Sequence, residues 1–580
     1  MKNSRRAGGV QTPMLKLPVE RSYILIGLVL AWFLALLIRA FYLQGMDNHF
    51  LRQKGDERSR RVIELTAHRG MITDRNGEPL AISTPVESVW VSPKDFEITP
   101  ERIRQLGKIL EMSEADVKSR FTRSQRDFIY LKRQVPPETA ERVMQVNAPG
   151  VFLQREYRRY YPAGEVVAHI LGFTGVEDNG QEGLELTYQK WLAGKPGNRH
   201  VIKDRLGHIV EDVESVQPPQ DGHDLAISID RKIQYLAYRE LKAAVIAQKA
   251  KAGAIVVLDA KTGEILALAN LPAYNPNNRT KLNRNSTRNR AVTDTFEPGS
   301  TMKPFTAAAV LESGKFTPAS LIQTAPGSFT IGSATIHDSH PEGTLTISQV
   351  IQKSSNVGAA KMALSLQPEY LWNVFDQMGF GKVPHAGFPG EATGRLRPYK
   401  TWQPIEQATM AYGHGISVSL LQLARAYMAF TGDGEIRPVS LIKVDAQPAG
   451  VKVISPETSQ AVRSMLELVV LPGGTAPRAQ VMGYRVAGKT GTAHKEENGR
   501  YAENRYIASF VGLAPASNPR LIVAVMIDEP SNGQYYGGAV AAPVFSQVMA
   551  GALRLLSVPP DAPTNNILPL ESAPEVKEVV

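Results

Sequence analysis

The chain of 580 residues contains no cysteine. Disulfide bonds, thiol nucleophiles and cysteine-based zinc sites are therefore excluded. Zinc-finger spacing, basic-aromatic RNA-binding motifs, internal repeats and heptads are also missing. The net charge of +10 therefore favours an anionic lipid or an anionic cell-wall polymer as partner, and we expect no nucleic acid.

Only one apolar run has membrane-spanning length. It covers residues 23–43, with Arg39 able to reach the headgroups. Basic residues are concentrated in the preceding segment 1–22, so the positive-inside rule keeps that end in the cytoplasm and places the remainder outside. A cleaved signal peptide is the alternative. The length of the run and the lack of a small-x-small site before Gln44 favour a retained anchor.

The remainder of the chain divides by composition. Residues 45–225 form a polar region with helical patterns at 99–117 and 137–146, and we expect an extended α+β domain without catalytic motifs. Strand and helix patterns alternate over residues 226–556. Residues 557–580 are rich in proline and acidic side chains, which predicts a disordered tail.

Three short motifs follow one another in the second half of the chain. They are Ser300-Thr-Met-Lys303, Ser354-Ser-Asn356 and Lys489-Thr-Gly-Thr492. The first supplies a hydroxyl three residues before an amine, the second another hydroxyl and an amide, and the third another amine. Serine activated by lysine is a known acyl-transfer nucleophile, and this set of motifs is associated with β-lactamases and penicillin-binding proteins.

The surroundings of Ser300 suit this chemistry. Pro298-Gly299 breaks the chain before it, and Pro304 is tolerated only in the first turn of the apolar helix predicted at 305–311. Ser300 and Lys303 would then share one helix face, near the free N–H groups of the helix start. An apolar setting would favour the neutral amine of Lys303, the form that accepts a proton.

Two of the motif patterns occur a second time in the chain, in surroundings that do not suit acyl transfer. Ser440 and Lys443 repeat the first spacing, but residues 437–444 have a strand pattern that would point the two side chains to opposite faces. Lys261-Thr-Gly263 joins two apolar runs and predicts a hairpin turn.

A phosphate-binding loop is the main alternative from another class. Residues 483–490 satisfy its pattern in full, and residues 521–528 imitate the strand that ends in a magnesium-binding acid. Such a loop needs a helix after it, whereas Gly491 follows directly and residues 494–499 predict a turn. We therefore rank a P-loop NTPase far below acyl transfer.

Two histidines, His337 and His340, lie three residues apart in a Gly/Ser-rich stretch. Such a pair is more often part of a loop than a metal site. We therefore expect no metal and no cofactor.

Several longer stretches carry a family resemblance. They are Arg69-Gly-Met-Ile-Thr-Asp-Arg75, residues 158–165, residues 168–174, Phe296-Glu-Pro-Gly-Ser-Thr-Met-Lys303, residues 352–357 and residues 487–493. The chain resembles the class B penicillin-binding proteins, which are D,D-transpeptidases, and within them the division-specific type of Gram-negative bacteria. It departs from the usual pattern at Met302, where valine is frequent, and at His494, where an arginine or glutamine-like residue is common.

This resemblance implies the fold and the location. The fold would be the penicillin-recognising serine transpeptidase fold, an α/β (α+β) arrangement with a mostly antiparallel sheet flanked by helices. The third motif would lie on an edge strand, beside strands at 506–513 and 521–527. An extended α+β pedestal and one transmembrane helix would precede it. The protein would be a single-pass inner-membrane protein with a periplasmic catalytic domain.

The resemblance also implies roles for five residues of the three motifs. Ser300 would attack the penultimate D-alanine of a peptidoglycan stem peptide, and Lys303 would take its proton. Ser354 and Lys489 would relay a proton to the departing D-alanine. Asn356 would hold the substrate amide and help to hold Lys303.

The third motif would bind the end of the substrate. Thr490, Gly491 and Thr492 would form the substrate-binding segment, with the two threonines on the terminal carboxylate. The backbone N–H groups of Ser300 and Thr492 would form the oxyanion hole.

The implied partners are D-Ala-D-Ala donor peptides, amine acceptors, β-lactams, an FtsW-type glycan polymerase and other division proteins. Two alternatives keep the fold. One is a penicillin-recognising sensor or scaffold of the division complex. The other is a hydrolase, either a D,D-carboxypeptidase or a β-lactamase.

Overall fold

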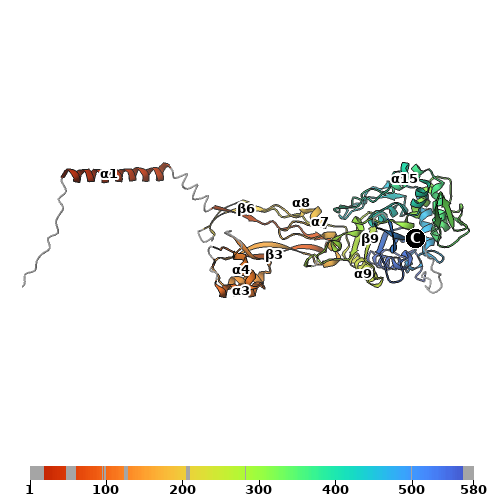
Figure 1. Cartoon of the computed structure of the whole chain (residues 1–580), viewed down its shortest axis with the longest axis horizontal. Helices are drawn as coiled ribbons and strands as arrows, with labels where there is room; N and C mark the ends of the chain where they lie inside the picture. The colour runs from red at the N-terminus through yellow and green to blue at the C-terminus, as the bar shows by residue number, and fades with distance from the viewer. Residues whose placement is uncertain are drawn as a thin grey trace, which may run out of the picture. The chain divides into compact units, whose positions relative to one another are not determined.

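The computed structural model describes residues 19–46, 60–93, 96, 99–122, 128–203, 209–280, 282–497 and 500–565. Their contacts divide the chain into two compact units. One comprises residues 1–66 and 196–219, and the other comprises residues 67–195 and 220–580. Figure 1 follows the chain through both units, which are described separately.

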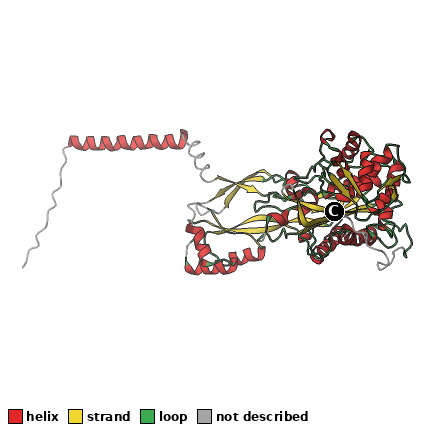
Figure 2. Ribbon diagram, turned by 45° about the vertical axis from the view of Figure 1, so that its right-hand side comes forward, coloured by secondary structure: helices red, strands yellow, loops and turns green. Residues whose placement is uncertain are grey.

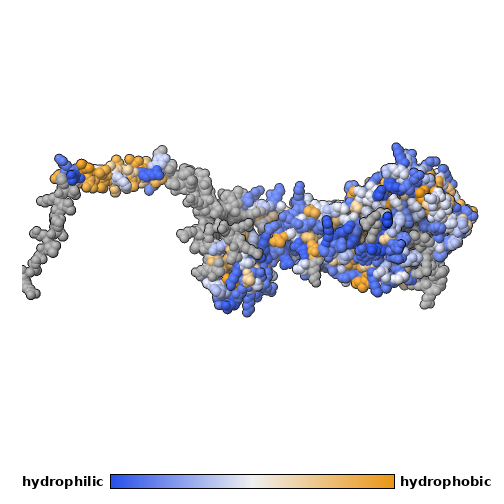
Figure 3. Space-filling model, in the orientation of Figure 1, coloured by the Kyte–Doolittle hydropathy of each residue, from blue (hydrophilic) through white to orange (hydrophobic). Residues whose placement is uncertain are grey.

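The first unit holds the apolar helix and a small sheet. Helix α1 (Val19–Phe41) continues into one π-helical turn, η1 (Tyr42–Met46), and none of its residues is buried. Residues 19–44 are long and apolar enough to cross a membrane. The hydropathy colours of Figure 3 show the apolar surface of this helix. The antiparallel sheet has the order β1 (Arg60–Leu65), β6 (Gly197–Lys203), β7 (Ile209–Gln217).

The N-terminal part of the second unit is built on one long strand. Strand β3 (Pro79–Val91) pairs with β4 (Ile129–Val135), β5 (Val151–Tyr160) and the short β2 (Ile72–Thr73), which also pairs with β8 (Leu225–Ala226). Three helices share a small apolar core with this sheet: α3 (Pro100–Leu110), α4 (Glu114–Thr122) and α5 (Pro137–Gln145). The helical pattern predicted at 99–117 is split because Glu111 adopts a left-handed conformation, with φ of 54°.

The C-terminal part contains a five-stranded antiparallel sheet. Its order is β10 (Ile265–Leu271), β9 (Ala252–Asp259), β19 (Leu521–Asp528), β18 (Arg500–Ala514), β17 (Ala487–Glu497). Every residue of β9, β10 and β19 is buried, which requires cover on both faces. Helices α9 (Arg231–Ala247) and α20 (Ala542–Leu555) pack on it as one pair, and α11 (Arg290–Thr293) and α17 (Leu420–Ala426) as another. The prediction of a mostly antiparallel sheet flanked by helices is confirmed (Figure 2).

A helical lobe completes this part. Its central helix is α12 (Lys303–Glu312), which packs on α13 (Ile347–Lys353), α14 (Asn356–Leu364), α15 (Pro368–Gln377) and α18 (Pro456–Val470). Phe305 of α12 meets the rings of Phe380, Tyr427 and Phe430 at centroid distances of 5.0, 5.3 and 5.2 Å. The helix is therefore fixed in an apolar, close-packed core.

The remaining elements are short. They are η2 (Gly164–Val166), α6 (Ala168–Leu171), α7 (Gly183–Thr187), α8 (Gln189–Leu192), α10 (Arg284–Thr287), η3 (Gly299–Met302), β11 (Leu321–Gln323), β12 (Ser328–Ile331), β13 (Ala334–His337), β14 (Thr344–Thr346), η4 (Tyr399–Thr401), α16 (Pro404–Met410), η5 (Tyr427–Phe430), β15 (Glu435–Ile436), β16 (Val451–Lys452), η6 (Pro477–Ala479) and α19 (Gly537–Val540).

Local predictions are partly confirmed. Lys261-Thr-Gly263 forms the turn between β9 and β10, as predicted. The strand predicted at 437–444 is wrong, because Ser440 and Ile442 form only isolated bridges there. The turn predicted at 494–499 is wrong for residues 494–497, which belong to strand β17. Residues 498–499 lie outside the described residues.

The prediction of a disordered tail from residue 557 is wrong at its start. Residues 557–565 are placed, because the carbonyl of Val558 accepts from Tyr484 Oη and the N–H of Asp561 donates to Gly483. Residues 566–580 of the predicted tail lie outside the described residues.

Candidate active site

Ser300 lies at the start of the central helix. It belongs to the single turn η3, which runs directly into α12, so the predicted position near a helix start is confirmed. Gly299 before it has φ of 57°, and a Cβ added there would stand 3.0 Å from the carbonyl oxygen of Thr492. Glycine therefore permits both the backbone conformation and the close approach of this turn to strand β17.

Lys303 connects the first motif with the second. Its side chain is fully buried, and its Nζ lies 2.9 Å from Ser300 Oγ and 3.0 Å from Ser354 Oγ. It also donates to the carbonyl oxygen of Ser354. The prediction that Ser300 and Lys303 share one face is confirmed.

A second lysine donates a hydrogen bond to Ser354. Its Oγ lies 2.9 Å from the Nζ of Lys489, which is also fully buried. Ser354 ends helix α13 with φ of 60°, a conformation that residues other than glycine seldom adopt. The geometry brings two amines to one hydroxyl, and one of these amines is bonded to Ser300.

Strand β17 carries the third motif along the edge of the sheet, as predicted. Thr490 Oγ1 lies 3.1 Å from Lys489 Nζ and 2.8 Å from Thr475 Oγ1. Thr492 Oγ1 accepts from the N–H of Gly537 at 3.1 Å. The hydroxyls of the two threonines are thus held by their surroundings.

Gly491 allows the strand to approach the serine turn. A Cβ at this position would lie 2.7 Å from the carbonyl oxygen of Pro298 and 2.9 Å from Thr301 Cγ2. Such distances are not tolerated against backbone. The glycine between the two threonines is therefore required by the packing of β17 on η3.

Asn356 begins helix α14 at the edge of the cluster. Its Nδ2 donates to the carbonyl oxygen of His337 at 3.1 Å. Ser355 caps the same helix and donates to Asp338 Oδ2 at 2.6 Å, while Asp338 Oδ1 accepts from the N–H of Val357. Asp338 was not singled out from the sequence, where nothing distinguishes it from other loop acids. A bond between Asn356 and Lys303 stays a prediction.

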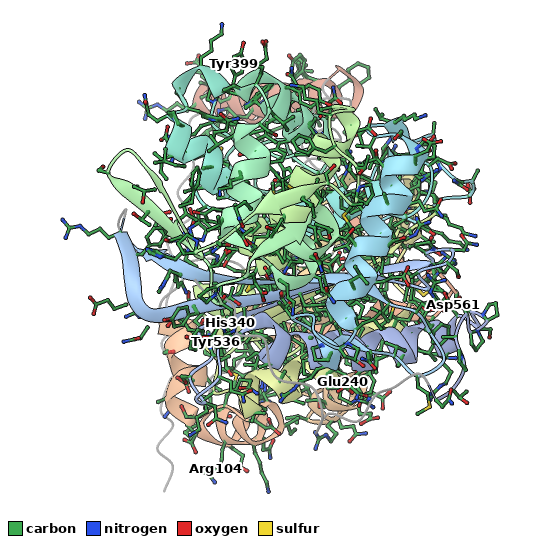
Figure 4. All side chains as sticks on the ribbon, turned by 90° about the vertical axis from the view of Figure 1, so that its right-hand side faces the viewer. Arg104, Glu240, His340, Tyr399, Tyr536 and Asp561 are labelled. Carbon is green, nitrogen blue, oxygen red and sulfur yellow. The ribbon has the colours of Figure 1, made fainter. Side chains whose placement is uncertain are left out.

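Aromatic rings and two histidines lie beside these motifs. The His494 ring lies 4.7 Å from that of Tyr506, which stacks on Tyr535 at 4.0 Å. Tyr535 and Tyr536 share a hydrogen bond of 2.9 Å between their hydroxyls, and Tyr536 is labelled in Figure 4. Sequence reasoning noted His494 but missed the rings, for which the adjacent pair of tyrosines was the only signal.

The second histidine, His414, is electrostatically linked to the site. Burial is the main cause that lowers its pKa to about 4. His414 is therefore neutral at neutral pH. Burial also raises the pKa of Glu297, whose carboxylate accepts from Tyr501 Oη and from the N–H of Gly415.

The other copies of the motifs do not contribute to this cluster. Ser440 Oγ donates to the carbonyl oxygen of Ile442 at 2.7 Å, within its own loop. Residues 487–497 form a strand, which contradicts the helix that a phosphate-binding loop needs after Thr490. Within the part of the chain that the structure describes, no group of three or more His, Cys, Asp or Glu side chains is placed to hold a metal ion.

Comparisons with known proteins find relatives of this chain over most of its length. A family model described as "Penicillin binding protein transpeptidase domain" matches residues 253–550, and one described as "Penicillin-binding Protein dimerisation domain" matches residues 64–227. The probable peptidoglycan D,D-transpeptidase PenA of Neisseria gonorrhoeae is 43% identical over 92% of this chain and 92% of its own length. The peptidoglycan D,D-transpeptidase FtsI of Escherichia coli is 43% identical over 94% of this chain and 93% of its own.

A solved structure resembles the C-terminal part. The apo structure of the TP domain from Burkholderia pseudomallei penicillin-binding protein 3 matches with a TM-score of 0.54 and 51% identity. The match covers 58% of this chain and 98% of that one.

Proposed function

Because the chain belongs to the family of penicillin-binding-protein transpeptidases, we propose that it is a septal peptidoglycan D,D-transpeptidase that forms a serine acyl-enzyme on D-Ala-D-Ala. The observation that carries the proposal is the distance of 2.9 Å between Lys303 Nζ and Ser300 Oγ. This is hydrogen-bond distance, at which an amine can take the proton of a serine hydroxyl.

Acylation uses both lysines. Ser300 Oγ attacks the carbonyl of the penultimate D-alanine while its proton passes to Lys303. The bond to the terminal D-alanine then breaks, and the leaving amine takes a proton from Lys489 through the hydroxyl of Ser354. The bonds of 3.0 and 2.9 Å that Ser354 Oγ makes to Lys303 and Lys489 support this relay.

The same geometry provides a reason for a neutral base. Two ammonium groups that donate to one hydroxyl oxygen repel each other, and burial also disfavours charge. Both lysine side chains are fully buried. The favoured state therefore has one neutral amine, and Lys303 takes that role because it bonds Ser300.

The oxyanion hole and the substrate pocket use β17. A Cβ at Gly299 would lie within 3.5 Å of the backbone nitrogen of Thr492, so the N–H groups of Ser300 and Thr492 come from adjacent backbone segments. We assign these two N–H groups to the developing oxyanion. Thr490, Gly491 and Thr492 would hold the terminal carboxylate.

The acyl-enzyme formed on a stem peptide has two outcomes in this proposal, and a β-lactam forms an acyl-enzyme of its own. An amine from a second stem peptide attacks the ester carbonyl, releases Ser300 and leaves a cross-link, with Asn356 holding the substrate amide. Water in place of the amine gives carboxypeptidase activity. A β-lactam acylates Ser300 and is released slowly.

The membrane location and partners follow from the same family membership. The apolar helix at residues 19–44 supports a single-pass anchor in the inner membrane, with a cytoplasmic N-terminus and a periplasmic catalytic domain. A glycan polymerase of the FtsW type would supply the strands. Its contacts would lie on the anchor and the region that follows it.

Covalent labelling tests the proposal most directly. Ser300→Ala should abolish labelling by a fluorescent penicillin while the melting temperature stays close to that of the unmodified chain. Ser440→Ala is the matched control and should label normally, because that hydroxyl serves its own loop. Mass spectrometry should map the adduct to Ser300, and an adduct on any other serine refutes the assignment. Acylation without cross-linking of stem peptides would support a sensor or scaffold instead.

A further inference from the structure

A groove with apolar walls lies on the second unit. Its volume is about 840 Å³. Helices α9 and α20 form one wall, and the segment before and within η2 forms the other. The apolar residues and the glycine that line it are Ala163, Val166, Tyr235, Leu236, Gly551 and Leu555. None of them belongs to the three motifs, so the groove needs an explanation outside the chemistry at Ser300.

The walls of the groove are packed, but its surface is apolar and open. A Cβ added at Gly551 would lie 2.4 Å from Leu236 Cδ2, so α20 is in close contact with α9 at this point. At the surface, Tyr235 is 55% exposed and Leu555 is 45% exposed. Two large apolar side chains beside one hollow are typical of a surface that another chain segment covers.

The rim of the groove carries an excess of positive charge. The charged residues that line it are Asp74, Glu78, Arg231, Lys232, Arg239 and Arg554. Asp74 accepts from backbone N–H groups, and Glu78 pairs with Arg231 at 3.3 Å. Arg239 pairs with its neighbour Glu240. Lys232 and Arg554 make no ion pair and no side-chain hydrogen bond among the described residues, so the rim offers two cations to an acidic ligand.

The end of this chain has the matching composition. Residues 566–580, which lie outside the described residues, read Asn-Ile-Leu-Pro-Leu-Glu-Ser-Ala-Pro-Glu-Val-Lys-Glu-Val-Val. Their apolar side chains are Ile567, Leu568, Leu570, Val576, Val579 and Val580. Their charged side chains are Glu571, Glu575, Lys577 and Glu578. The segment is therefore both apolar and acidic, as the walls and the rim of the groove require.

The segment is also long enough to reach the groove. Leu555 lines the groove, and ten residues later the described part of the chain ends at Asn565. These two residues are at most about 36 Å apart, whereas residues 566–580 span up to about 54 Å when extended. The tail can therefore return to α20 wherever Asn565 lies.

We propose that residues 566–580 dock in this groove of their own chain. Their apolar side chains cover Tyr235 and Leu555, and their glutamates pair with Lys232 and Arg554 at the rim. The groove lies between η2 and two helices that pack on the five-stranded sheet. The docked tail therefore joins the N-terminal part of the second unit to its C-terminal part.

Photo-crosslinking gives the first test. Benzoylphenylalanine, a photo-crosslinking residue, replaces Tyr235 in the full-length protein in detergent, and mass spectrometry should map its adducts to residues 566–580. The same residue in place of Ile246 is the matched control. Ile246 is 67% exposed on α9 but does not line the groove, so it should give no adduct with the tail. No tail adduct from position 235, or equal yields from the two positions, would overturn the proposal.

Charge reversal tests the pairing at the rim. Lys232→Glu combined with Arg554→Glu should lower the yield of the tail adduct about tenfold or more, whereas Lys232→Arg combined with Arg554→Lys should retain it. Glu571→Lys, Glu575→Lys and Glu578→Lys together should also lower the yield, and they should restore it in the protein with the reversed rim. An unchanged yield in both reversed proteins would overturn the proposal.

The tail variant keeps this test decisive if the reversed rim unfolds the protein. Its three substitutions lie outside the described fold, and thermal unfolding should show the same melting temperature as that of the unmodified chain.

A mixture of isotope-labelled and unlabelled protein identifies the occupant. Adducts within one chain support the proposal, whereas adducts between a labelled and an unlabelled chain mean that a second copy supplies the tail and overturn it. Adducts with a separate protein in cells, without any tail adduct, also overturn it. None of these measurements depends on catalysis at Ser300, so they hold whether or not the proposed function does.

Discussion

Two buried groups of basic side chains in the second unit differ in what faces them. Arg69 and Arg159 converge on one carboxylate, with Arg69 Nε 2.8 Å from Glu185 Oε2 and Arg159 Nε 2.7 Å from Glu185 Oε1. All three side chains are almost fully buried. Lys303 and Lys489 are also buried, but they converge on the hydroxyl of Ser354.

The two groups show two uses of buried basic side chains, one that stabilises the structure and one that suits proton transfer. A carboxylate between two guanidinium groups is held by two permanent positive charges, because arginine does not lose its proton. A hydroxyl can accept a proton from one neighbour and pass it to another, and a lysine amine can lose its proton when it is buried. The first arrangement fixes geometry, whereas the second permits proton transfer.

Removing one active-site amine should have the largest effect. Lys303→Met keeps the length of the side chain but removes the proposed base, so we expect the rate of penicillin acylation to fall by about 10² to 10⁴-fold. The melting temperature should stay the same or rise, because an apolar side chain replaces a buried amine. Stopped-flow acylation and thermal unfolding measure the two effects.

A different result would remove the contrast between the groups. If Lys303→Met unfolded the protein, or if it acylated at the normal rate, then Lys303 would be structural like Arg69.

The arginine group should show the opposite pattern. Glu185→Ala leaves two buried guanidinium groups without their shared carboxylate, so we expect a loss of about 3 to 5 kcal/mol in the free energy of unfolding. Acylation per folded molecule should be unchanged, because Glu185 makes no contact with the three motifs in the described bonds. Urea unfolding and labelling of the soluble fraction measure these two quantities.

Glu177→Ala is the matched control for that loss. Its carboxylate pairs with Arg133 but is 69% exposed, so its removal should cost less than about 1 kcal/mol. An equal loss in both variants would show that burial does not distinguish the Glu185 group.

The two groups also differ in how far the sequence predicted them. The spacing of Ser300 and Lys303, with Pro298 and Pro304 on either side, predicts a shared helix face because local geometry fixes it. The distance from Ser354 to Lys489 cannot be predicted in that way, because 135 residues separate them. Only the family resemblance implied that contact.

The arginine group shows what sequence patterns miss. Arg69 was quoted as part of a resemblance, but nothing in its surroundings indicated burial against Glu185, which lies 116 residues away. The strand predicted at 437–444 failed for a related reason. Ser440 and Ile442 form isolated bridges to two other segments instead of a continuous ladder with a neighbouring strand. Long-range packing therefore decides whether such a segment becomes a strand.

A third buried basic residue, His169, provides the prediction with the smallest expected effect, a change of stability with pH. It has no counter-ion in its described bonds, and its Nε2 donates to the carbonyl oxygen of Ser286 at 2.8 Å. Burial lowers its pKa to about 4, so the ring is neutral in the folded protein at pH 5 and largely protonated in the unfolded chain. The unfolded state then binds more protons, and stability falls as the pH falls from about 6.5 towards 4.

The expected loss from pH 7 to pH 5 is about 2 kcal/mol for this one histidine. His169→Gln keeps a donor for Ser286 but has no titrating group, so its urea midpoint should fall less than that of the unmodified chain over this interval. Burial lowers the pKa of His414 to about 4 and raises that of Asp178 to about 6. Both residues are present in the two proteins, so their contributions cancel in the comparison. Parallel pH curves for the two proteins would mean that His169 is protonated in the fold, as the arginines beside Glu185 are.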